Sequence, residues 1–319
     1  MLYDSFGRVH NYLRISVTDA CNLRCIYCMP DDRMAFTKTN KLMSPDEIDR
    51  LATVFVKLGV NKIRITGGEP LLRKDITEII DKLSRQDANL TISTNALLAN
   101  EYVNVFKAAQ IKSINVSLDT LNPEEFFLLT KRNQFEKIYS NILLLLRNNF
   151  TVKVNFVVMR NVNENSITQF IEWTKDFPLE IRFIEFMPFT GNNWKSEKVF
   201  SYDEIIDLIE SKYSILKIED SKHDTTRKYR AVGHLGTFGI ISTITKPFCN
   251  ECNRLRLTSD GKLKNCLFSK NETDLLTALR KDEDIVPLIY SSLSDKKEER
   301  GGQFDAGEII NRSMVSIGG

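Results

Sequence analysis

The stretch Cys21-Asn22-Leu23-Arg24-Cys25-Ile26-Tyr27-Cys28 places three cysteines at the spacing C-x-x-x-C-x-x-C, just after a strand-like run at 12–17. Thiolates in so short a loop can converge on one soft metal centre. Cubane [4Fe–4S] clusters are normally held by four cysteine thiolates, so three local cysteines would leave one iron without a protein ligand. Open coordination positions serve chemistry, whereas closed metal sites are usually structural. The stretch therefore predicts a reactive iron–sulfur centre.

A second set of three cysteines follows near the other end of the chain. Cys249, Cys252 and Cys266 have the spacing C-x-x-C-x13-C, and the six cysteines of the chain leave no seventh thiol to complete either set. Arg254 and Arg256 follow two and four residues after Cys252. Because arginine presents a fixed fork of donors that suits phosphate oxygens, this pair favours an anionic ligand over a sealed structural site.

Zinc sites or structural thiols are the alternative interpretations of both sets. Zinc sites usually pair two C-x-x-C units or add histidines. His10 is the single histidine near the first set, and His234 is a distant ligand that could complete the second. The iron–sulfur interpretation is favoured for both.

The composition is that of an ordinary globular protein. The 319 residues are 42% hydrophobic and 27% charged, which permits a large core and one domain or slightly more. A net charge of +2 gives no reason to expect nucleic acid as a partner. No apolar run has the length of a membrane span, and no signal-peptide core is present, so we expect no membrane association. Cysteines grouped in two metal sites indicate a reducing compartment, with the cytoplasm as the default.

Strand-like and helix-like segments alternate over the first part of the chain. Strands are expected at 12–17, 62–66, 90–95, 113–119, 152–158 and 180–187. Helices are expected between them. Ser44-Pro45-Asp46-Glu47, for example, is a capping box with proline at the first helical position, and Ser201 with Glu204 predicts another. This alternation predicts a parallel α/β architecture.

The predicted strands have one polar and one aliphatic face. Arg14, Arg64, Asn115 and Lys153 lie on the polar face. A doubly wound sheet buries both faces, and a closed eight-stranded barrel fills its lumen with bulky branched residues. We therefore predict an incomplete, open parallel (β/α)6 TIM-like barrel that lines a wet cavity, with the site at the carboxyl ends of the strands. The last strand breaks this phase, which leaves the direction of Arg182 open.

A soft boundary divides the chain within the weakly patterned stretch 217–235. We assign residues 1–216 to the partial barrel. Residues 217–319 form a C-terminal extension that carries the second cysteine set and ends in Gly318-Gly319.

The loop 21–28, with an aromatic residue before its last cysteine, resembles the signature of the radical S-adenosylmethionine (SAM) superfamily. The stretches Gly67-Gly68-Glu69-Pro70 and Arg254-Leu255-Arg256, the second cysteine set and the terminal diglycine narrow this resemblance. From about residue 7 to residue 319 the chain is similar to the GTP 3',8-cyclase (MoaA-type) family of molybdenum cofactor biosynthesis.

The resemblance implies a lyase with two [4Fe–4S] clusters and SAM. The first cysteine set would hold the cluster that cleaves SAM to a 5'-deoxyadenosyl radical. That radical would take the 3' hydrogen of GTP, giving (8S)-3',8-cyclo-7,8-dihydroguanosine 5'-triphosphate in the first step of molybdopterin biosynthesis. The second cluster would hold guanine through its open iron. The implied partners are GTP, an electron donor, the next enzyme of the molybdopterin pathway and a second copy of the chain.

Carried over position by position, the resemblance implies two groups of contacts. SAM would be contacted by Tyr27, Gly68, Glu69, Ser117 and Met187. GTP would be contacted by Arg14, Arg64, Ser93, Lys153, Arg182, Arg254 and Arg256. The cations of the polar strand face support the GTP contacts, because a cation that points inward is costly to desolvate without an anion. A bound polyphosphate would supply that anion. The terminal diglycine is expected to reach into the cavity. Ser93 stands in place of a usual threonine and Ala96 in place of a usual glycine, which can alter that turn.

Two other functions compete with the cyclase. The first is another twin-cluster radical SAM enzyme, such as a peptide-modifying maturase, but that class does not require Arg254, Arg256 or the diglycine end. The second is an iron–sulfur electron carrier. Carriers shield fully ligated clusters, whereas both cysteine sets here are one ligand short.

Overall fold

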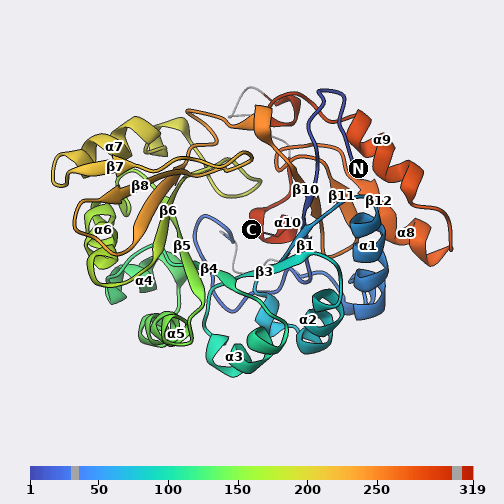
Figure 1. Cartoon of the computed structure of the whole chain (residues 1–319), viewed down its shortest axis with the longest axis horizontal. Helices are drawn as coiled ribbons and strands as arrows, with labels where there is room; N and C mark the ends of the chain where they lie inside the picture. The colour runs from blue at the N-terminus through green and yellow to red at the C-terminus, as the bar shows by residue number, and fades with distance from the viewer. Residues whose placement is uncertain (30–35, 304–310, 319) are drawn as a thin grey trace.

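Six parallel strands follow one another in chain order and form the body of the molecule. The computed structural model describes residues 1–29, 36–303 and 311–318. The sheet is curved into an open barrel (Figure 1). Its central strands are β1 (Tyr12–Ser16), β2 (Lys62–Thr66), β3 (Asn89–Thr94), β4 (Ser113–Ser117), β5 (Thr151–Val158) and β6 (Glu180–Glu185). All six strands that the sequence predicts are present, with ends that differ by one or two residues.

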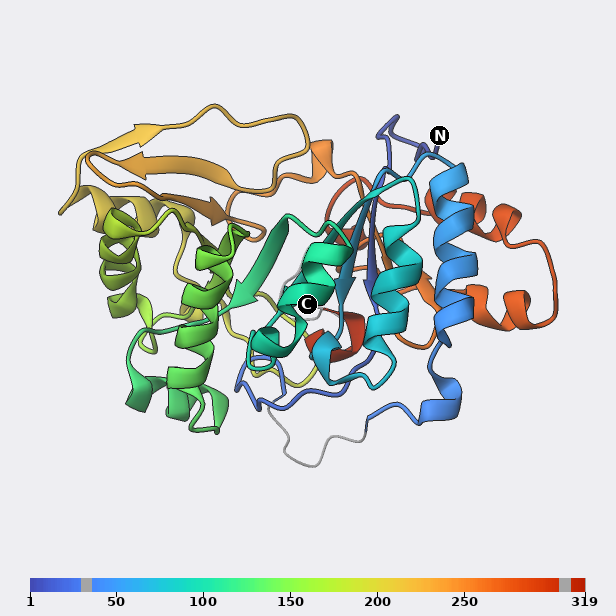
Figure 2. The ribbon, with the colours of Figure 1, turned by 60° about the horizontal axis from the view of Figure 1, so that its bottom comes forward.

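Helices cover the outer face of this sheet, as Figures 1 and 2 both show. They are α1 (Pro45–Lys57), α2 (Ile76–Ser84), α3 (Ala99–Ala108), α4 (Pro123–Thr130), α5 (Phe135–Arg147), α6 (Ile167–Asp176) and α7 (Tyr202–Glu210). The aliphatic side chains of the strands, such as Leu13, Ile63 and Val154, are completely buried against them. Burial of this face is the main stabilising term, at roughly 1.5–3 kcal/mol for each large side chain.

Local sequence signals set the helix ends. In α1, the Ser44 hydroxyl accepts from the backbone N–H of Glu47, and the Glu47 carboxylate accepts from the backbone N–H of Ser44 at 2.7 Å. Ser201 and Glu204 form the same capping box at the start of α7. Both boxes confirm the sequence prediction, and each satisfies backbone donors that a helix start leaves free.

The C-terminal part extends the sheet at both edges. β9 (Thr237–Ile241) pairs in parallel with β6, and β10 (Arg254–Leu257) pairs in parallel with β1. Antiparallel strands then continue each edge: β8 (Arg227–Ala231) and β7 (Ile215–Lys217) beyond β9, and β11 (Lys262–Lys264) and β12 (Thr273–Asp274) beyond β10. The remaining helices are α8 (Leu275–Arg280), α9 (Val286–Ser294) and α10 (Met314–Ile317). The second cysteine set is thereby brought beside the first strand of the barrel.

The turn after β3 holds Ala96 in a conformation that usually favours glycine. This residue has φ +63°, the left-handed conformation that glycine adopts at little cost. The Asn141 side chain holds the turn by donating to the carbonyl oxygen of Ala96 at 2.7 Å. The turn therefore keeps a conformation suited to glycine while carrying a buried methyl group.

Within the described residues, no helix is long and apolar enough to cross a lipid bilayer.

Candidate active site

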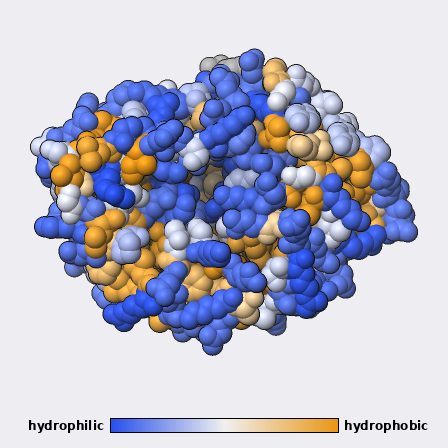
Figure 3. Space-filling model, viewed as in Figure 1, coloured by the Kyte–Doolittle hydropathy of each residue, from blue (hydrophilic) through white to orange (hydrophobic). Residues whose placement is uncertain are grey.

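A cavity of about 400 Å³ lies at the centre of the barrel, between the inner faces of the strands and the C-terminal segments. Figure 3 shows a hollow near the centre of this face, with mostly hydrophilic residues around it. A volume of this size is typical of pockets that hold small molecules. The polar strand face thus lines a wet cavity, as the alternation of the sequence predicts.

The cavity is strongly basic. The basic side chains that line it are Arg14, Lys62, Arg64, Lys153, Arg182, Arg254, Arg256 and Arg300. In the described part of the chain, Asp224 is the one carboxylate among the lining residues. Burial lowers the pKa of Arg14 well below its usual range, and the nearby Arg256 lowers it further. Such crowding of buried cations is relieved by a polyanion.

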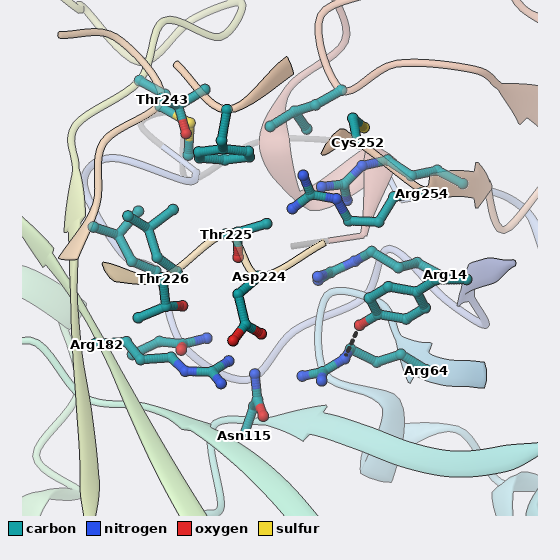
Figure 4. A pocket seen from close by; sticks show the side chains of 18 of the residues that line it. Arg14, Arg64, Asn115, Arg182, Asp224, Thr225, Thr226, Thr243, Cys252 and Arg254 are labelled. Carbon is teal, nitrogen blue, oxygen red and sulfur yellow. Dashed lines mark hydrogen bonds between the residues drawn. The ribbon is translucent and has the colours of Figure 1, made fainter. Parts of the chain in front are cut away.

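Strand register explains why three of these arginines gather. Arg14 on β1 lies opposite Arg64 on β2 and opposite Arg256 on β10, so the three side chains leave adjacent parallel strands side by side. Figure 4 shows Arg14 and Arg64 directed into the pocket. Arg64 donates to the Tyr12 hydroxyl through Nε and to Ser93 Oγ through Nη1 at 3.3 Å. Ser93 itself is not among the residues that line the cavity. Its hydroxyl contacts Arg64, which does line the cavity.

Glu180 holds the cations on the opposite wall. Its carboxylate lies 3.1 Å from Lys153 Nζ and 2.6 Å from Arg182 Nε. Arg182, whose direction the sequence left open, points into the cavity (Figure 4). Met187 lines the cavity as well. By strand alternation it would lie on the same side as the buried Ile181, but β6 ends at Glu185, so the alternation does not extend to Met187.

The first cysteine set lies at the carboxyl end of β1. Cys21, Cys25 and Cys28 are free thiols, and the backbone N–H of Cys28 donates to the carbonyl oxygen of Cys25 at 3.0 Å. Burial, together with the nearby Cys21 and Asp119, raises the pKa of Cys28 to about 12. Cys25 is affected in the same way by Asp119 and by both other cysteines, so the three thiols lie within electrostatic reach of one another. This donor set fits a [4Fe–4S] cluster with one open iron.

The glycines at 67 and 68 pack against the backbone of the cysteine loop. A Cβ on Gly68 would lie 2.4 Å from the carbonyl oxygen of Ala20, and one on Gly67 would lie 2.6 Å from that of Thr18. The adjacent Glu69 is completely buried and accepts from Thr94 Oγ1 at 2.7 Å and from the backbone N–H groups of Leu71 and Asn95. Burial raises the pKa of Glu69 to about 7. This segment therefore braces the cysteine loop.

Tyr27 and Asp119 connect the loop to the barrel. The Tyr27 hydroxyl donates to Asp119 Oδ2 at 2.8 Å, and Asp119 Oδ1 accepts from the backbone N–H of Val157 at 2.8 Å. Burial raises the pKa of Asp119 to about 6. Ser117, at the end of β4, is exposed. Tyr27, Gly68 and Glu69 belong to the first cysteine loop or lie against it, and neither they nor Ser117 are among the residues that line the basic cavity.

The second cysteine set lies on the cavity wall itself. Cys249, Cys252 and Cys266 all line the cavity, with Arg254 beside them. Burial alone raises the pKa of the Cys252 thiol, but Arg254 and Lys296 outweigh it and bring the pKa to about 6. A thiolate is the form that binds iron, so this site also fits a cluster. Among the described residues, no three His, Cys, Asp or Glu side chains are arranged to hold a single metal ion.

The C-terminal segment enters the barrel. Arg256 Nη1 donates to the carbonyl oxygen of Gly318 at 2.9 Å, and a Cβ on Gly318 would lie 2.5 Å from Thr66 Oγ1. The backbone N–H of Val315 reaches the Cys28 thiol. Figures 1 and 2 both place this end of the chain at the centre of the molecule. Gly319, the second residue of the diglycine, lies outside the described residues.

Sequence reasoning missed several lining residues. Tyr12 and Lys62 belong to strands that the sequence predicts, at 12–17 and 62–66, but no motif indicates a role for either residue. Tyr12 lies among Arg64, Arg14 and Lys62. Burial raises its pKa, but these cations outweigh burial and bring it to about 7. Asp224, Thr225 and Thr226 come from a stretch that had no assigned structure. Their only signal is spatial, because no motif links this stretch to the barrel.

Comparisons with known proteins agree with this site. Residues 15–174 match the model of the radical SAM superfamily, and residues 179–301 match that of Molybdenum Cofactor Synthesis C. The GTP 3',8-cyclase of Peptoclostridium acidaminophilum is 43% identical over 324 residues, which is 100% of this chain and 98% of the relative. The chain belongs to the GTP 3',8-cyclase family. The mitochondrial GTP 3',8-cyclase of Arabidopsis thaliana is also 43% identical, over 100% of this chain and 84% of the relative.

Family members differ in length. The chain spans about half of the curated mouse and human relatives, both named Molybdenum cofactor biosynthesis protein 1, at 51% of each. Among solved structures, Streptococcus suis SuiB bound to S-adenosylmethionine has a TM-score of 0.65 at 15% identity, covering 91% of this chain and 68% of that chain. This likeness confirms the open parallel barrel. The two family models meet between residues 174 and 179, and the division at residue 216 stays a prediction.

Proposed function

We propose that this chain is a radical SAM GTP 3',8-cyclase, a lyase that converts GTP into (8S)-3',8-cyclo-7,8-dihydroguanosine 5'-triphosphate in the first step of molybdopterin biosynthesis. The observation that carries this proposal is one basic cavity with a three-cysteine set on its wall and a second such set at the end of β1. The family relationship supports the same reaction.

Cys21, Cys25 and Cys28 would hold the cluster that binds SAM, and Cys249, Cys252 and Cys266 would hold the second. When bound, the first cluster and SAM supply the 5'-deoxyadenosyl radical that takes the 3' hydrogen of GTP. Around this site, Asn95 Nδ2 lies 3.8 Å from Cys21 Sγ, and Tyr27 is fixed by Asp119. The complete burial of Glu69 favours a role in shaping the Gly67–Gly68 turn over a direct contact with SAM.

The basic side chains bind and orient GTP. Arg14, Arg64 and Arg256 form one continuous row across three strands, and Lys153 and Arg182 face them from β5 and β6. Arginine forks bind phosphate oxygens with two parallel hydrogen bonds, so this row suits a triphosphate. Ser93 positions Arg64 rather than lining the cavity. The second cysteine set lies on the same cavity wall, which suits the expectation that guanine binds there.

The segment around Gly318 narrows the cavity between the two cysteine sets. Since Val315 reaches Cys28 and Gly318 is bound by Arg256, this segment contacts both sides of the proposed site. An electron donor, the next enzyme of the pathway, a second copy of the chain and a cytoplasmic location stay predictions.

Anaerobic product analysis tests the proposal. The protein is reconstituted with iron and sulfide, and dithionite, SAM and GTP are added. Mass spectrometry is expected to detect 5'-deoxyadenosine together with a product isomeric with GTP. Formation of 5'-deoxyadenosine without consumption of GTP would contradict the cyclase and favour a peptide-modifying maturase. Absence of SAM cleavage would favour an electron carrier.

A further inference from the structure

The segment between β7 and β8 crosses the mouth of the basic cavity. Asp224, Thr225 and Thr226 line the cavity, and the same three residues line a second hollow together with Ser221, Lys222 and Glu251. Segment 219–226 therefore forms a wall between two spaces. Most of its hydrogen bonds are made within itself or to the adjoining strand, and one contact, from His223 Nδ1 to the carbonyl oxygen of Glu251 at 2.9 Å, joins it to the second cysteine set.

Asp224 places a carboxylate among the cations of the cavity. Figure 4 shows it pointing toward Arg182 and Asn115, on the side of the pocket away from Cys252. Burial lowers the pKa of Lys62, and the Asp224 carboxylate is among the charges that oppose this shift, so the two side chains interact. The Asp224 carboxylate therefore lies where the phosphate oxygens of a ligand would meet the cations of the cavity.

Among the described residues, two hydrogen bonds hold the Asp224 carboxylate in place, and both come from its own segment or the next strand. Asp224 Oδ2 accepts from Lys228 Nζ at 2.6 Å and from the backbone N–H of Ser221 at 3.0 Å. Both side chains of the Asp224–Lys228 pair keep about a quarter of their surface exposed, at 29% and 23%. Such partly exposed pairs contribute little to stability, so the Asp224–Lys228 pair can be broken at small cost.

A triphosphate cannot share these cations with Asp224 without repulsion, since like charges in one cavity disfavour each other. We propose that Asp224 is an internal competitor of the substrate: in the substrate-free protein its carboxylate lies among the phosphate-binding cations of the cavity, and binding of a polyphosphate displaces it together with segment 219–226. The inference rests on the proposed function only in taking this cavity as a polyphosphate site.

The affinities of three probes test this inference in wild type, Asp224→Asn and Asp220→Asn. The probes are inorganic triphosphate, GTP and guanosine, measured by calorimetry with EDTA present and again with Mg²⁺. Asp220→Asn is the matched control, because Asp220 lies on the same segment, pairs with Lys217 and lines only the second hollow. Circular dichroism checks that each variant is folded.

We expect Asp224→Asn to bind inorganic triphosphate and GTP roughly tenfold more tightly than wild type, while guanosine affinity stays unchanged and Asp220→Asn behaves as wild type. Equal or weaker triphosphate binding by Asp224→Asn would overturn the inference. A loss seen only with Mg²⁺ would also overturn it and would identify Asp224 as a metal ligand. If wild type binds triphosphate but not GTP, the proposed function is wrong. The competitor role of Asp224 is then still tested by comparing the triphosphate affinities of wild type and Asp224→Asn.

Discussion

Arg256 and Gly318 are joined by a hydrogen bond of 2.9 Å from Nη1 of the arginine to the carbonyl oxygen of the glycine. Arg256 is 8% exposed and lies beside Arg14 through the register of β1 and β10. The Arg256 side chain therefore both lines the cavity and binds the C-terminal segment. Burial, together with the nearby Arg254, lowers the pKa of Arg256 to about 10, so the arginine still carries its charge at neutral pH.

Replacing Arg256 by alanine is expected to weaken GTP binding by about tenfold to a hundredfold, the range for one charged hydrogen-bonding partner. Iron and sulfide content should stay at wild-type levels, because Arg256 contributes no thiolate. Calorimetry and iron analysis give the two readouts. Arg230→Ala is the control, since Arg230 is an exposed arginine on β8 that does not line the cavity. Unchanged GTP affinity in Arg256→Ala would show that it does not bind phosphate.

Replacing Gly318 by alanine is expected to expel the C-terminal segment from the barrel. The new Cβ would lie 2.5 Å from Thr66 Oγ1 and 2.8 Å from Ser16 Cβ, and the backbone has φ +85°. Limited proteolysis should then cut near residues 311–318, and formation of the cyclic product should fall by at least about tenfold while SAM cleavage continues.

Gly233→Ala separates the two causes of this effect. Gly233 has φ +82° but nothing within 4 Å of an added Cβ, so alanine there carries only the conformational cost of about 1 kcal/mol. If Gly233→Ala and Gly318→Ala reduced activity equally, the steric explanation for Gly318 would be wrong.

The fold was largely predictable because strand alternation is a local property. Ile63 and Ile65 alternate with Lys62 and Arg64, and a one-residue shift would place the charges on the face that packs against the helices, so sequence determines both the strand and its inward face. The prediction failed for β7 and β8. Their residues are mostly exposed or half-buried on both sides, so no alternation marks them. The pairing of β8 with β9 and of β7 with β8, which stabilises them, depends on the tertiary structure.

The site was predictable to the extent that it lies on strands. Arg14 and Arg64 followed from the polar face, and both line the cavity. Asp224 could not be found, because its position depends on how segment 219–226 crosses the barrel. The role of Glu69 also needed the structure, since only there do Thr94 and Asn95 meet its carboxylate.

The two cysteine sets should differ in reactivity in the metal-free protein. Cys252 has a pKa of about 6 because Arg254 and Lys296 outweigh burial, whereas burial, with a contribution from Glu69, raises the pKa of Cys21 to about 11. At about pH 7, iodoacetamide should therefore alkylate Cys252 before Cys21, as read by peptide mass mapping, since only thiolates react. Arg254→Ala should slow alkylation of Cys252. Faster labelling of Cys21 than of Cys252 would contradict the electrostatic difference between the sites.

A buried histidine should make stability depend on pH. His10 is 0% exposed, and its Nε2 lies 3.0 Å from Asp4 Oδ2. Burial, with repulsion from Lys296, lowers its pKa to about 4, against the opposing effect of Asp4. The folded state therefore binds fewer protons than the unfolded state between the ordinary histidine pKa of about 6.5 and about 4. Stability from this group is full above that window and is lost as pH falls through it, by about 3 kcal/mol.

Comparison with His10→Gln isolates this contribution, because glutamine can donate to Asp4 but does not titrate. Urea unfolding of the metal-free proteins is measured at about pH 7 and about pH 5. Glu69 and Asp119 have raised pKa values, so their contribution runs in the opposite direction and is common to both proteins. The free energy of unfolding of wild type should therefore fall relative to that of His10→Gln as the pH is lowered. Parallel pH profiles would mean that folding does not shift the pKa of His10, and a rise of wild type relative to His10→Gln at low pH would mean that His10 is protonated in the folded state as an ion pair with Asp4.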